Sequence, residues 1–486
     1  MAVVNQLKQP RGLHLLFFLE LCDRFSYYGI QSVFVLYLTK TFSFADSHAY
    51  SLYGVYTALA FSTPVLGGYL ADRFLGYQKT IGYGLLLMTL GNLALLFSGT
   101  LSFYLGLSLI IVGIGLFKAN NAALLGGLYQ KNDARRESGF TIFYMGMNVG
   151  AILGPLTFGY IALHFGWIYG FTLSALELAV SLILFTVSKK TLLPSNGAAF
   201  FHHKSLNLEQ STFLFIIILL SVFAINIFFY YPILFKAVLW LVGIFVLSYV
   251  LFLAYEKPAG ERNKILAIII LNIFAIFFFA CQVQIGSSLT LFIDRLVNKH
   301  TFGWQIPTAA FSSLQPFFVI LTAPLLAPLW SYLEEHHYSF STVSRIFLGL
   351  LLGSISFACF AFSAYSSRWH TTINLPLIML VIGNFILGAG ELCIGPVMMS
   401  AVTYLIPKEL QGRIMGMWFL SIAFSSYLGS FLAQVADLEK KKPNINSIIY
   451  FHSFSNTSLI VFIAALFLLM LSPVIRSLVS NPAGSE

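Results

Sequence analysis

Residues 109–127 read LIIVGIGLFKANNAALLGG, an apolar run that contains a single charged side chain, Lys118. The run is long enough to cross the hydrocarbon core of a bilayer, which takes about 20 residues of helix. Similar runs recur along a chain of 486 residues that is 58% hydrophobic and only 9% charged. Because soluble proteins carry about 25% charged residues, this composition indicates a polytopic membrane protein. Continuous apolar runs exclude the alternating pattern of a membrane β-barrel, so we predict an all-α fold.

The breaks between the apolar runs predict fourteen transmembrane helices. These lie near residues 14–38, 50–70, 80–98, 103–126, 139–163, 168–187, 212–230, 237–255, 265–292, 309–332, 344–364, 374–404, 413–435 and 457–476. An even number places both termini on the same side, and the N-terminal residues, which lack a cleavage pattern, are interpreted as a cytoplasmic tail. That orientation puts about twice as many lysine and arginine residues in the cytoplasm as outside, as the positive-inside rule expects. The net charge of +9 therefore needs no nucleic-acid partner.

An internal repeat organises the chain into two halves. GIGLFKAN (113–120) resembles GAGELCIG (388–395), and GFTIFYMGMN (139–148) resembles GRIMGMWFLS (412–421) at a nearly equal offset. The repeat predicts six-helix bundles at 1–190 and 263–486, joined by a linker and two inserted, peripheral transmembrane helices within 191–262. This is the architecture of major facilitator transporters, whose substrate site lies near the membrane midplane between the halves. The segment GGYLADRFLGYQKT (67–80) is similar to a loop that this superfamily carries between its second and third helices.

The first apolar run contains a cluster of charges. At helical spacing, Glu20, Asp23, Arg24, Tyr27 and Gln31 fall on one face, with Tyr28 at its edge. Charges at bilayer depth cost about 2.5–3.5 kcal/mol each, so they must face one another, another helix or water. The cluster could simply cap the start of a helix or snorkel to the interface. We favour a proton site, because a carboxylate that loses its arginine partner is driven towards protonation.

Two further charges lie inside apolar runs. Lys118 could be a structural lysine paired with a carboxylate, or it could neutralise Glu20 or Asp23, or receive an anionic group of a substrate. Glu391, in NFILGAGELCIGP, is the matching lone acid of the second half and could instead pair with a basic neighbour for packing. We favour a cavity polarised between these two residues, suited to a substrate with both charges. Glu177 also lies in an apolar run, but the sequence shows no partner for it.

Several classes of function are excluded or disfavoured. The four cysteines have no ligand-like spacing, so neither disulfides nor a metal site is expected, and no cofactor is expected. No nucleotide-binding loop is present, and no nucleophile–base pair stands out, so we predict that the protein is not an enzyme. Aromatic residues are too frequent to single any out by position, although Trp304, Trp418 and Phe419 could line the cavity.

The motifs resemble those of the proton-dependent oligopeptide transporter family of the major facilitator superfamily, in its bacterial type with two extra central helices. The first-helix motif of the family, Glu-x-x-Glu-Arg-Phe-x-Tyr-Tyr-Gly, is similar to ELCDRFSYYG (20–29). GLFKANNAALLG resembles its fourth-helix motif and FTIFYMGMNVGA its fifth-helix signature. Segments around SSLTLFIDR, FGWQIPTAAFSSLQP and GELCIGP resemble later helices, so the similarity extends along nearly the whole chain.

The resemblance implies roles for individual residues. Glu20, Asp23 and Arg24 would form the proton-coupling cluster, with Lys118 as its salt-bridge partner. Lys118 and Tyr28 would also approach a peptide carboxylate. Asn148 and Glu391 would receive the peptide amino group and backbone, and Trp418 would be a pocket wall. The residues expected at the substrate site are Tyr27, Tyr28, Gln31, Lys118, Asn148, Gln315, Glu391 and Trp418.

The chain departs from the family pattern at several positions. Asp23 replaces a glutamate, and Val283, between Gln282 and Gln284, stands where many members have a helix-7 glutamate. Gln31, Phe61 and Gln315 replace an arginine, a tyrosine and an asparagine, respectively. We expect transport to persist through Glu20, Asp23, Arg24 and Lys118, with an altered preference for side chain or peptide length.

The sequence therefore predicts a proton-coupled symporter that imports di- and tripeptides across the bacterial inner membrane by alternating access and works as a monomer. Two alternatives stay open. The chain could carry another small zwitterion or anion, or it could bind peptide as a sensor without transporting it.

Overall fold

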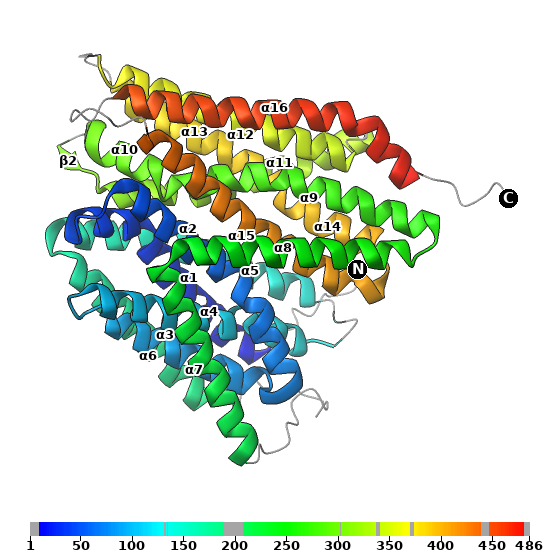
Figure 1. The fold of residues 1–486 in the computed structure, drawn as a ribbon, viewed down its shortest axis with the longest axis horizontal. Coiled ribbons are helices and arrows are strands. Elements are labelled where there is room, and N and C mark those ends of the chain that lie inside the picture. The colour runs from blue at the N-terminus through cyan, green and yellow to red at the C-terminus, as the bar shows by residue number, and fades with distance from the viewer. Residues whose placement is uncertain are drawn as a thin grey trace, which may run out of the picture. The chain divides into compact units, whose positions relative to one another are not determined.

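The computed structural model describes residues 9–130, 133, 135–188, 208–301, 303–336, 341–369, 374–438 and 447–480. The chain is built almost entirely of helices (Figure 1). They are α1 (Arg11–Thr41), α2 (Asp46–Leu70), α3 (Tyr77–Ala94), α4 (Thr100–Gly127), α5 (Arg136–His164), α6 (Trp167–Ser188), α7 (Leu208–Tyr230), α8 (Pro232–Tyr255), α9 (Ala259–Ile285), α10 (Ser288–Leu296), α11 (Leu314–Glu335), α12 (Thr342–Ser366), α13 (Leu375–Leu392), α14 (Gly395–Leu405), α15 (Lys408–Leu438) and α16 (Ser447–Ser480). One π-helical turn (Ala71–Leu75), one 3-10 turn (Thr308–Ser313) and a hairpin of β1 (His300–Thr301) with β2 (Trp304–Gln305) complete the described elements.

The helices account for the predicted spans. Within the described residues, eleven segments are long and apolar enough to cross a membrane, and α1, α2 and α3 add three more long helices. Two spans are interrupted in a way the sequence analysis did not predict: α9 and α10 together form Ala259–Leu296, and α13 and α14 together form Leu375–Leu405. The all-α prediction and the fourteen helical segments are therefore confirmed.

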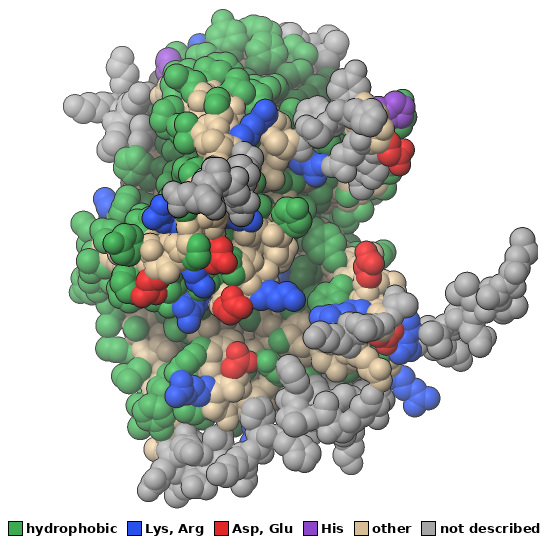
Figure 2. All heavy atoms as spheres, turned by 90° about the vertical axis from the view of Figure 1, so that its right-hand side faces the viewer, with side chains coloured by type: hydrophobic (Ala, Val, Ile, Leu, Met, Phe, Trp, Pro, Cys, Tyr) green, Lys and Arg blue, Asp and Glu red, His purple; other side chains and the backbone are tan. Residues whose placement is uncertain are grey.

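The surface is that of a membrane protein. Large hydrophobic side chains are exposed along most helices, including Leu66, Ile183, Phe245 and Met470. Figure 2 shows hydrophobic side chains on the flanks of the face drawn, with basic and acidic side chains gathered among polar and backbone atoms. An apolar flank of this kind is stable against lipid rather than water.

The chain divides into two compact units that do not follow its order. The first contains residues 1–33 and 59–231, and the second contains residues 34–58 and 232–486. The C-terminal part of α1 and the N-terminal part of α2 thus belong to the second unit. The division predicted from the repeat, at 1–190, 191–262 and 263–486, stays a prediction.

In the first unit, glycines let α3 and α4 approach closely. A Cβ at Gly91 would lie 2.6 Å from the carbonyl oxygen of Gly106, and one at Gly84 would lie 2.9 Å from that of Gly113. Close backbone contact between small residues is a main source of helix association in membranes, where the hydrophobic effect does not act between helices. Larger residues at these crossings would separate α3 from α4.

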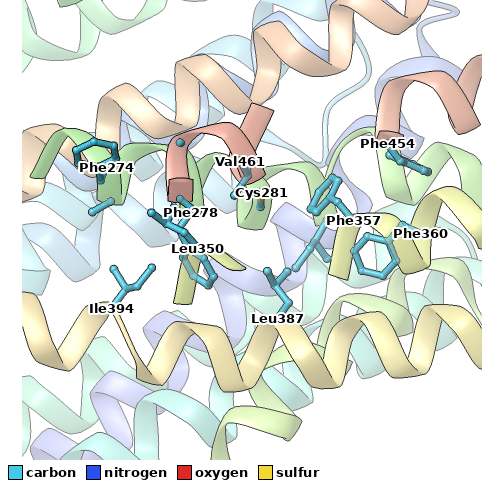
Figure 3. Close-up of a cluster of buried hydrophobic side chains, with 14 of the residues drawn as sticks. Phe274, Phe278, Cys281, Leu350, Phe357, Phe360, Leu387, Ile394, Phe454 and Val461 are labelled. Atoms are coloured by element: carbon cyan, nitrogen blue, oxygen red, sulfur yellow. The ribbon is translucent and has the colours of Figure 1, made fainter. Parts of the chain in front are cut away.

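The second unit has a continuous aromatic core. Phe278 of α9, Leu350 and Phe357 of α12, Leu387 of α13 and Phe454 of α16 are all fully buried and point towards one another (Figure 3). Polar contacts reinforce the packing of α12 against α16. The hydroxyls of Ser354 and Ser458 each donate to the other residue's carbonyl oxygen, at 2.9 and 2.8 Å.

The inserted helices α7 and α8 pack on different units. Tyr104 of α4 lies between Phe229 and Tyr230 of α7, with ring centroids 5.6 and 4.9 Å away. On the other side of the connection, Trp240 of α8 contacts Phe424 of α15 edge to face at 5.5 Å. Only Tyr231 separates the two helices.

Ion pairs attach the α1–α2 hairpin to the rest of the second unit. Asp46, at the start of α2, accepts two hydrogen bonds from the guanidinium of Arg295 in α10, at 2.6 and 2.8 Å. The same guanidinium donates to the hydroxyl of Tyr450 in α16 at 3.1 Å. Lys40, at the end of α1, pairs with Asp294 at 2.8 Å. A bidentate arginine–carboxylate pair is stronger and more directional than a lysine pair.

We expect Asp46→Asn to lower the stability of the protein by about 2 kcal/mol, because a largely buried guanidinium loses a charged acceptor. Lys40→Gln is the matched control, since the Lys40 side chain is 48% exposed and an exposed pair contributes less than about 1 kcal/mol. Thermal unfolding of the purified protein, followed by tryptophan fluorescence, measures both. Equal losses in the two variants would contradict the assignment of Asp46–Arg295 as the dominant pair.

Candidate functional site

The predicted charged stripe of α1 is present and buried in the first unit. Glu20, Asp23 and Arg24 are 1, 2 and 7% exposed. The Nε and Nη2 atoms of Arg24 donate to Oε1 of Glu20 at 2.9 and 2.7 Å. Asp23 is held much more loosely: its Oδ2 lies 3.8 Å from Nε of Arg24, and its Oδ1 accepts no hydrogen bond from any described residue. Arg24 therefore donates two hydrogen bonds to Glu20 and has only a long ion-pair contact with Asp23.

A residue that the sequence analysis did not name completes the Glu20 site. The side-chain amide of Asn121 in α4 donates to Oε2 of Glu20 at 2.8 Å. Asn121 follows Lys118 by three positions, so the two share a face of α4, and this spacing could have identified it. Both carboxylate oxygens of Glu20 therefore accept hydrogen bonds from described residues.

Lys118 lies beside the cluster, but it does not form the expected salt bridge. Within the part of the chain that the structure describes, no carboxylate oxygen lies within 4.0 Å of its Nζ atom. The ammonium instead sits over the ring of Phe61, 4.3 Å from the centroid, and 6.0 Å from that of Tyr27. Arg24 and Asn121 already occupy Glu20, and the aromatic faces offer a weaker cation site. Phe61, which stands where the family has a tyrosine, thus contacts the Lys118 ammonium through the face of its ring.

Glycines of α5 allow close packing against α1, the helix that carries the charged stripe. Gly146, Gly150 and Gly154 recur at intervals of four and face α1. A Cβ at Gly154 would lie 2.5 Å from the carbonyl oxygen of Phe25, and one at Gly150 would lie 2.7 Å from Cβ of Arg24. Because α5 presents no side chains here, α1 can pack directly against its backbone and hold Arg24 in place.

Other predicted residues of the first unit surround the stripe. The rings of Tyr27 and Tyr28 meet edge to face at 5.1 Å, and Tyr27 also contacts Phe61. Tyr28 and Gln31 are half-buried. The amide of Asn148 on α5 donates to a backbone carbonyl one turn earlier, that of Tyr144, at 2.9 Å. Among the described contacts, the Asn148 side chain makes no hydrogen bond to Glu20, Asp23 or Arg24.

The second unit has a different polar centre around Glu391. The side-chain amides of Gln282 on α9 and Gln315 on α11 both donate to Oε2 of Glu391, the first at 2.7 Å. Among the described residues, no lysine, arginine or histidine lies within 4.0 Å of this carboxylate. Glu391 is in the last turn of α13, where the helix dipole favours a cation. Two neutral donors and a negative helix end leave this site ready for a positive group.

The remaining predicted residues of the second unit have apolar contacts or lie outside the helices. Val283 packs against Gly429 of α15, so the position where the resemblance expects an acid is apolar. Trp418 is 3% exposed and contacts Phe279 within the core. Trp304 belongs to β2 and is 76% exposed, so it lies outside the helices, and its suggested place in the cavity wall stays a prediction.

Comparison with known proteins identifies the family of the chain. The POT family (PTR2) matches residues 78–451. The chain belongs to the POT family. This confirms the resemblance, and it makes the protein a membrane transporter and not an enzyme. Among individual relatives, it is 33% identical to "Uncharacterized transporter YclF" of Bacillus subtilis (strain 168), over 96% of this chain and 94% of the relative.

Two further POT-family comparisons cover the whole fold. The chain is 28% identical to "Peptide transporter YePEPT" of Yersinia enterocolitica, over 98% of this chain and 96% of the relative. It is 29% identical to a crystallised mutant of peptide transporter POT in complex with alafosfalin, with a TM-score of 0.83 over 99% of this chain and 97% of that one. The arrangement of helices is therefore that of solved POT-family transporters.

We expect Gly150→Ala to destabilise this POT-family protein by about 1–3 kcal/mol, the usual cost of overpacking, because the added methyl would press on Arg24 and the backbone of α1. Gly416→Ala on α15 is the control, since a methyl there would meet no atom of the described chain within 4 Å. The midpoint of thermal unfolding compares the two variants. A normal midpoint for Gly150→Ala would contradict the close packing of α5 on α1.

Proposed function

We propose that the protein is a proton-coupled symporter that imports di- and tripeptides across the bacterial inner membrane by alternating access, with both termini in the cytoplasm and the monomer as the working unit. The peptide transporters among its relatives support the substrate class. The observation that carries the coupling is the unequal pairing of two buried acids with Arg24.

Proton coupling would use Glu20, Asp23, Arg24 and Lys118. Arg24 can satisfy only one carboxylate fully, and in this structure it satisfies Glu20. In the proposed cycle, Asp23 carries the proton in this state, since it is buried and its Oδ1 accepts no hydrogen bond from a described residue. A shift of Arg24 towards Asp23 would release that proton. Glu20 would then keep only its hydrogen bond from Asn121 and could bind the next proton.

Substrate binding would use the complementary charges of the two units. Lys118, which contacts aromatic rings rather than a carboxylate, is free to receive a peptide carboxylate with Tyr28 beside it. Glu391 would receive the peptide amine, and Gln315 holds its carboxylate in place. The other residues that we propose for substrate binding are Tyr27, Gln31, Asn148 and Trp418.

A second candidate function is transport of another small zwitterion or anion. The apolar environment of Val283 favours it, because a missing helix-7 acid would alter either coupling or the gate. Uptake of labelled dialanine into liposomes under an imposed pH gradient tests the proposal. Peptide binding without any uptake would identify a sensor, and counterflow without pH-driven accumulation would show that coupling is lost.

We expect Glu20→Gln to keep peptide binding but to lose pH-driven accumulation, because the neutral amide cannot hold Arg24 as the carboxylate does. Glu409→Gln, at the exposed start of α15, is the control and should accumulate peptide normally. The liposome assay measures accumulation, and binding is measured separately by calorimetry. Unchanged accumulation in Glu20→Gln would remove Glu20 from the proton path.

We expect Glu391→Gln to weaken binding of dialanine about 10- to 100-fold, the equivalent of one hydrogen bond to a charged group. N-acetylated dialanine lacks the cationic amine, so its affinity should change little. Competition against a labelled peptide gives both affinities with the same protein sample. Equal weakening of the two peptides would contradict the amine-binding role.

A further inference from the structure

A groove runs between α12 and α16 in the second unit, and the proposed function gives it no role. The groove encloses about 480 Å³, within the range of about 300–1,000 Å³ that is typical of small-molecule sites. The two helices lie side by side (Figure 1), and both are long and apolar enough to span a membrane. Two large side chains of its walls, Phe362 and Leu459, are 40 and 56% exposed. In a membrane transporter, the groove therefore opens towards lipid.

Each helix lines this α12–α16 groove with one face. The lining residues of α12 fall at helical spacing of i, i+4, i+7, i+8 and i+11 and are Ser354, Ala358, Ala361, Phe362 and Tyr365. Those of α16 repeat the same spacing from Phe451 to Phe462. At the inner end, the hydroxyls of Ser354 and Ser458 donate to carbonyl oxygens of the facing helix, at 2.9 and 2.8 Å, so they are satisfied without a ligand. The groove is thus suited to an apolar occupant.

The length of the α12–α16 groove matches one leaflet of a bilayer. From Ser354 to Tyr365, a helix rises about 16 Å at 1.5 Å per residue. The hydrocarbon core is about 30 Å thick, so one leaflet contributes about half of that. Ser354 lies at the middle of α12 (Thr342–Ser366), and Tyr365 lies next to its last residue. The groove therefore follows the path of a single acyl chain, from the middle of the membrane to one surface.

Aromatic rings surround the surface end of the groove. The ring of Tyr365 lies 5.6 Å from that of Phe451 across the groove and 5.5 Å from that of Trp369. Trp369 is 45% exposed and also contacts Phe362 at 5.9 Å. Tyrosine and tryptophan concentrate at the depth of the lipid headgroups, where one part of the ring system is apolar and the other is wet. This end of the groove is therefore where an acyl chain would join its headgroup.

A positive charge lies beside the aromatic end. The guanidinium of Arg368 is 5.7 Å from the centroid of the Tyr365 ring, and its Nε donates to the hydroxyl of Ser447 at 2.6 Å. Among the hydrogen bonds between described residues, Arg368 uses only Nε, so its Nη edge can receive an anion. No described carboxylate lies within 4.0 Å of it, and neither α12 nor α16 contains an aspartate or a glutamate. A guanidinium above an apolar groove complements a phosphate above an acyl chain.

We propose that the α12–α16 groove is a binding site for an anionic phospholipid. One acyl chain lies between Ser354 and Tyr365, and the phosphate binds the guanidinium of Arg368. In the orientation proposed above, this lipid belongs to the periplasmic leaflet. The site requires neither peptide nor proton, so it is independent of the proposed transport cycle. Because the lipid contacts both helices of the folded protein, its binding stabilises the second unit.

A second copy of the chain is a less suitable occupant. A two-fold contact through this face would bring Arg368 of each copy to the same depth in the membrane. The two positive charges would repel each other, and α12 and α16 supply no acid to compensate them. An anionic lipid brings the missing negative charge with it.

Photolabelling of the full-length protein in nanodiscs tests the site. The probe is phosphatidylglycerol with a diazirine on one acyl chain, added as a trace to phosphatidylcholine, and labelled positions are mapped by mass spectrometry. Label should concentrate on the residues that line the groove, and excess unmodified phosphatidylglycerol should displace it. Diacylglycerol with the same diazirine lacks the phosphate and should label the groove at least fivefold less. Equal labelling by the two probes, or label spread evenly over the exposed helices, would overturn the proposal.

Variants at each end of the lipid separate chain from headgroup. Arg368→Gln should reduce labelling of the groove about fivefold, the effect of one arginine on an anionic lipid at a membrane surface. Ala358→Phe should abolish labelling by filling the groove, and its exposed position makes it the deciding variant if Arg368→Gln does not fold. Arg476→Gln, an exposed arginine towards the other end of the same helix pair, is the control and should label normally.

Thermal unfolding gives a second measurement on the same proteins. Added phosphatidylglycerol should raise the unfolding midpoint of the unaltered protein and of Arg476→Gln, but not that of Ala358→Phe. Normal labelling in Arg368→Gln, or an equal rise of the midpoint in Ala358→Phe, would contradict the site. A dimer that excludes the label from this face would show that a second copy, and not a lipid, occupies the groove.

Discussion

A guanidinium and a carboxylate 2.7 Å apart inside an apolar helix bundle govern the chemistry of the first unit. Burying either charge alone would cost far more than any single packing contact returns, so everything around the pair serves to keep it together. The amide of Asn121 occupies the second oxygen of Glu20, and glycines on α5 allow the backbone of α1 to lie close enough to fix Arg24. Asp23 has only a 3.8 Å contact with Arg24, because the guanidinium already donates two hydrogen bonds to Glu20.

The two units solve the problem of buried polarity differently. The first gathers charges of both signs, whereas the second surrounds Glu391 with the neutral amides of Gln282 and Gln315. A neutral shell orients a carboxylate without cancelling its charge. In the proposed function, the amine of the substrate meets the negative charge of Glu391, whereas the first unit already contains charges of both signs.

Much of the fold could be predicted from sequence, because lipid demands long apolar helices and charges inside them are conspicuous. The fourteen segments and the stripe of Glu20, Asp23 and Arg24 were of this kind. The breaks after Ile285 and Leu392 were not predicted, since each lies inside an apolar run, although Pro396 in the first turn of α14 is a local signal for the second break.

The assignment of the α1–α2 hairpin to the second unit could not have been predicted either, because it depends on pairs such as Asp46–Arg295 that join distant parts of the sequence. The absence of a direct bond from Lys118 to the acids has a similar origin. Arg24 and Asn121 occupy the oxygens of Glu20, and Phe61 contacts the Lys118 ammonium. This outcome depends on how three helices pack, so it could not be predicted from any one segment of the sequence.

The short connection between α7 and α8 has a mechanical consequence. Each helix is anchored to a different unit by aromatic contacts, yet only Tyr231 separates them, and Pro232 fixes the backbone angle that follows. If the units rotate against each other, as the proposed function requires, these two largely lipid-exposed helices would change their tilt in the surrounding bilayer. The viscosity and thickness of the membrane become part of the energy barrier, so the lipids around this hairpin help to set how fast the protein can change state.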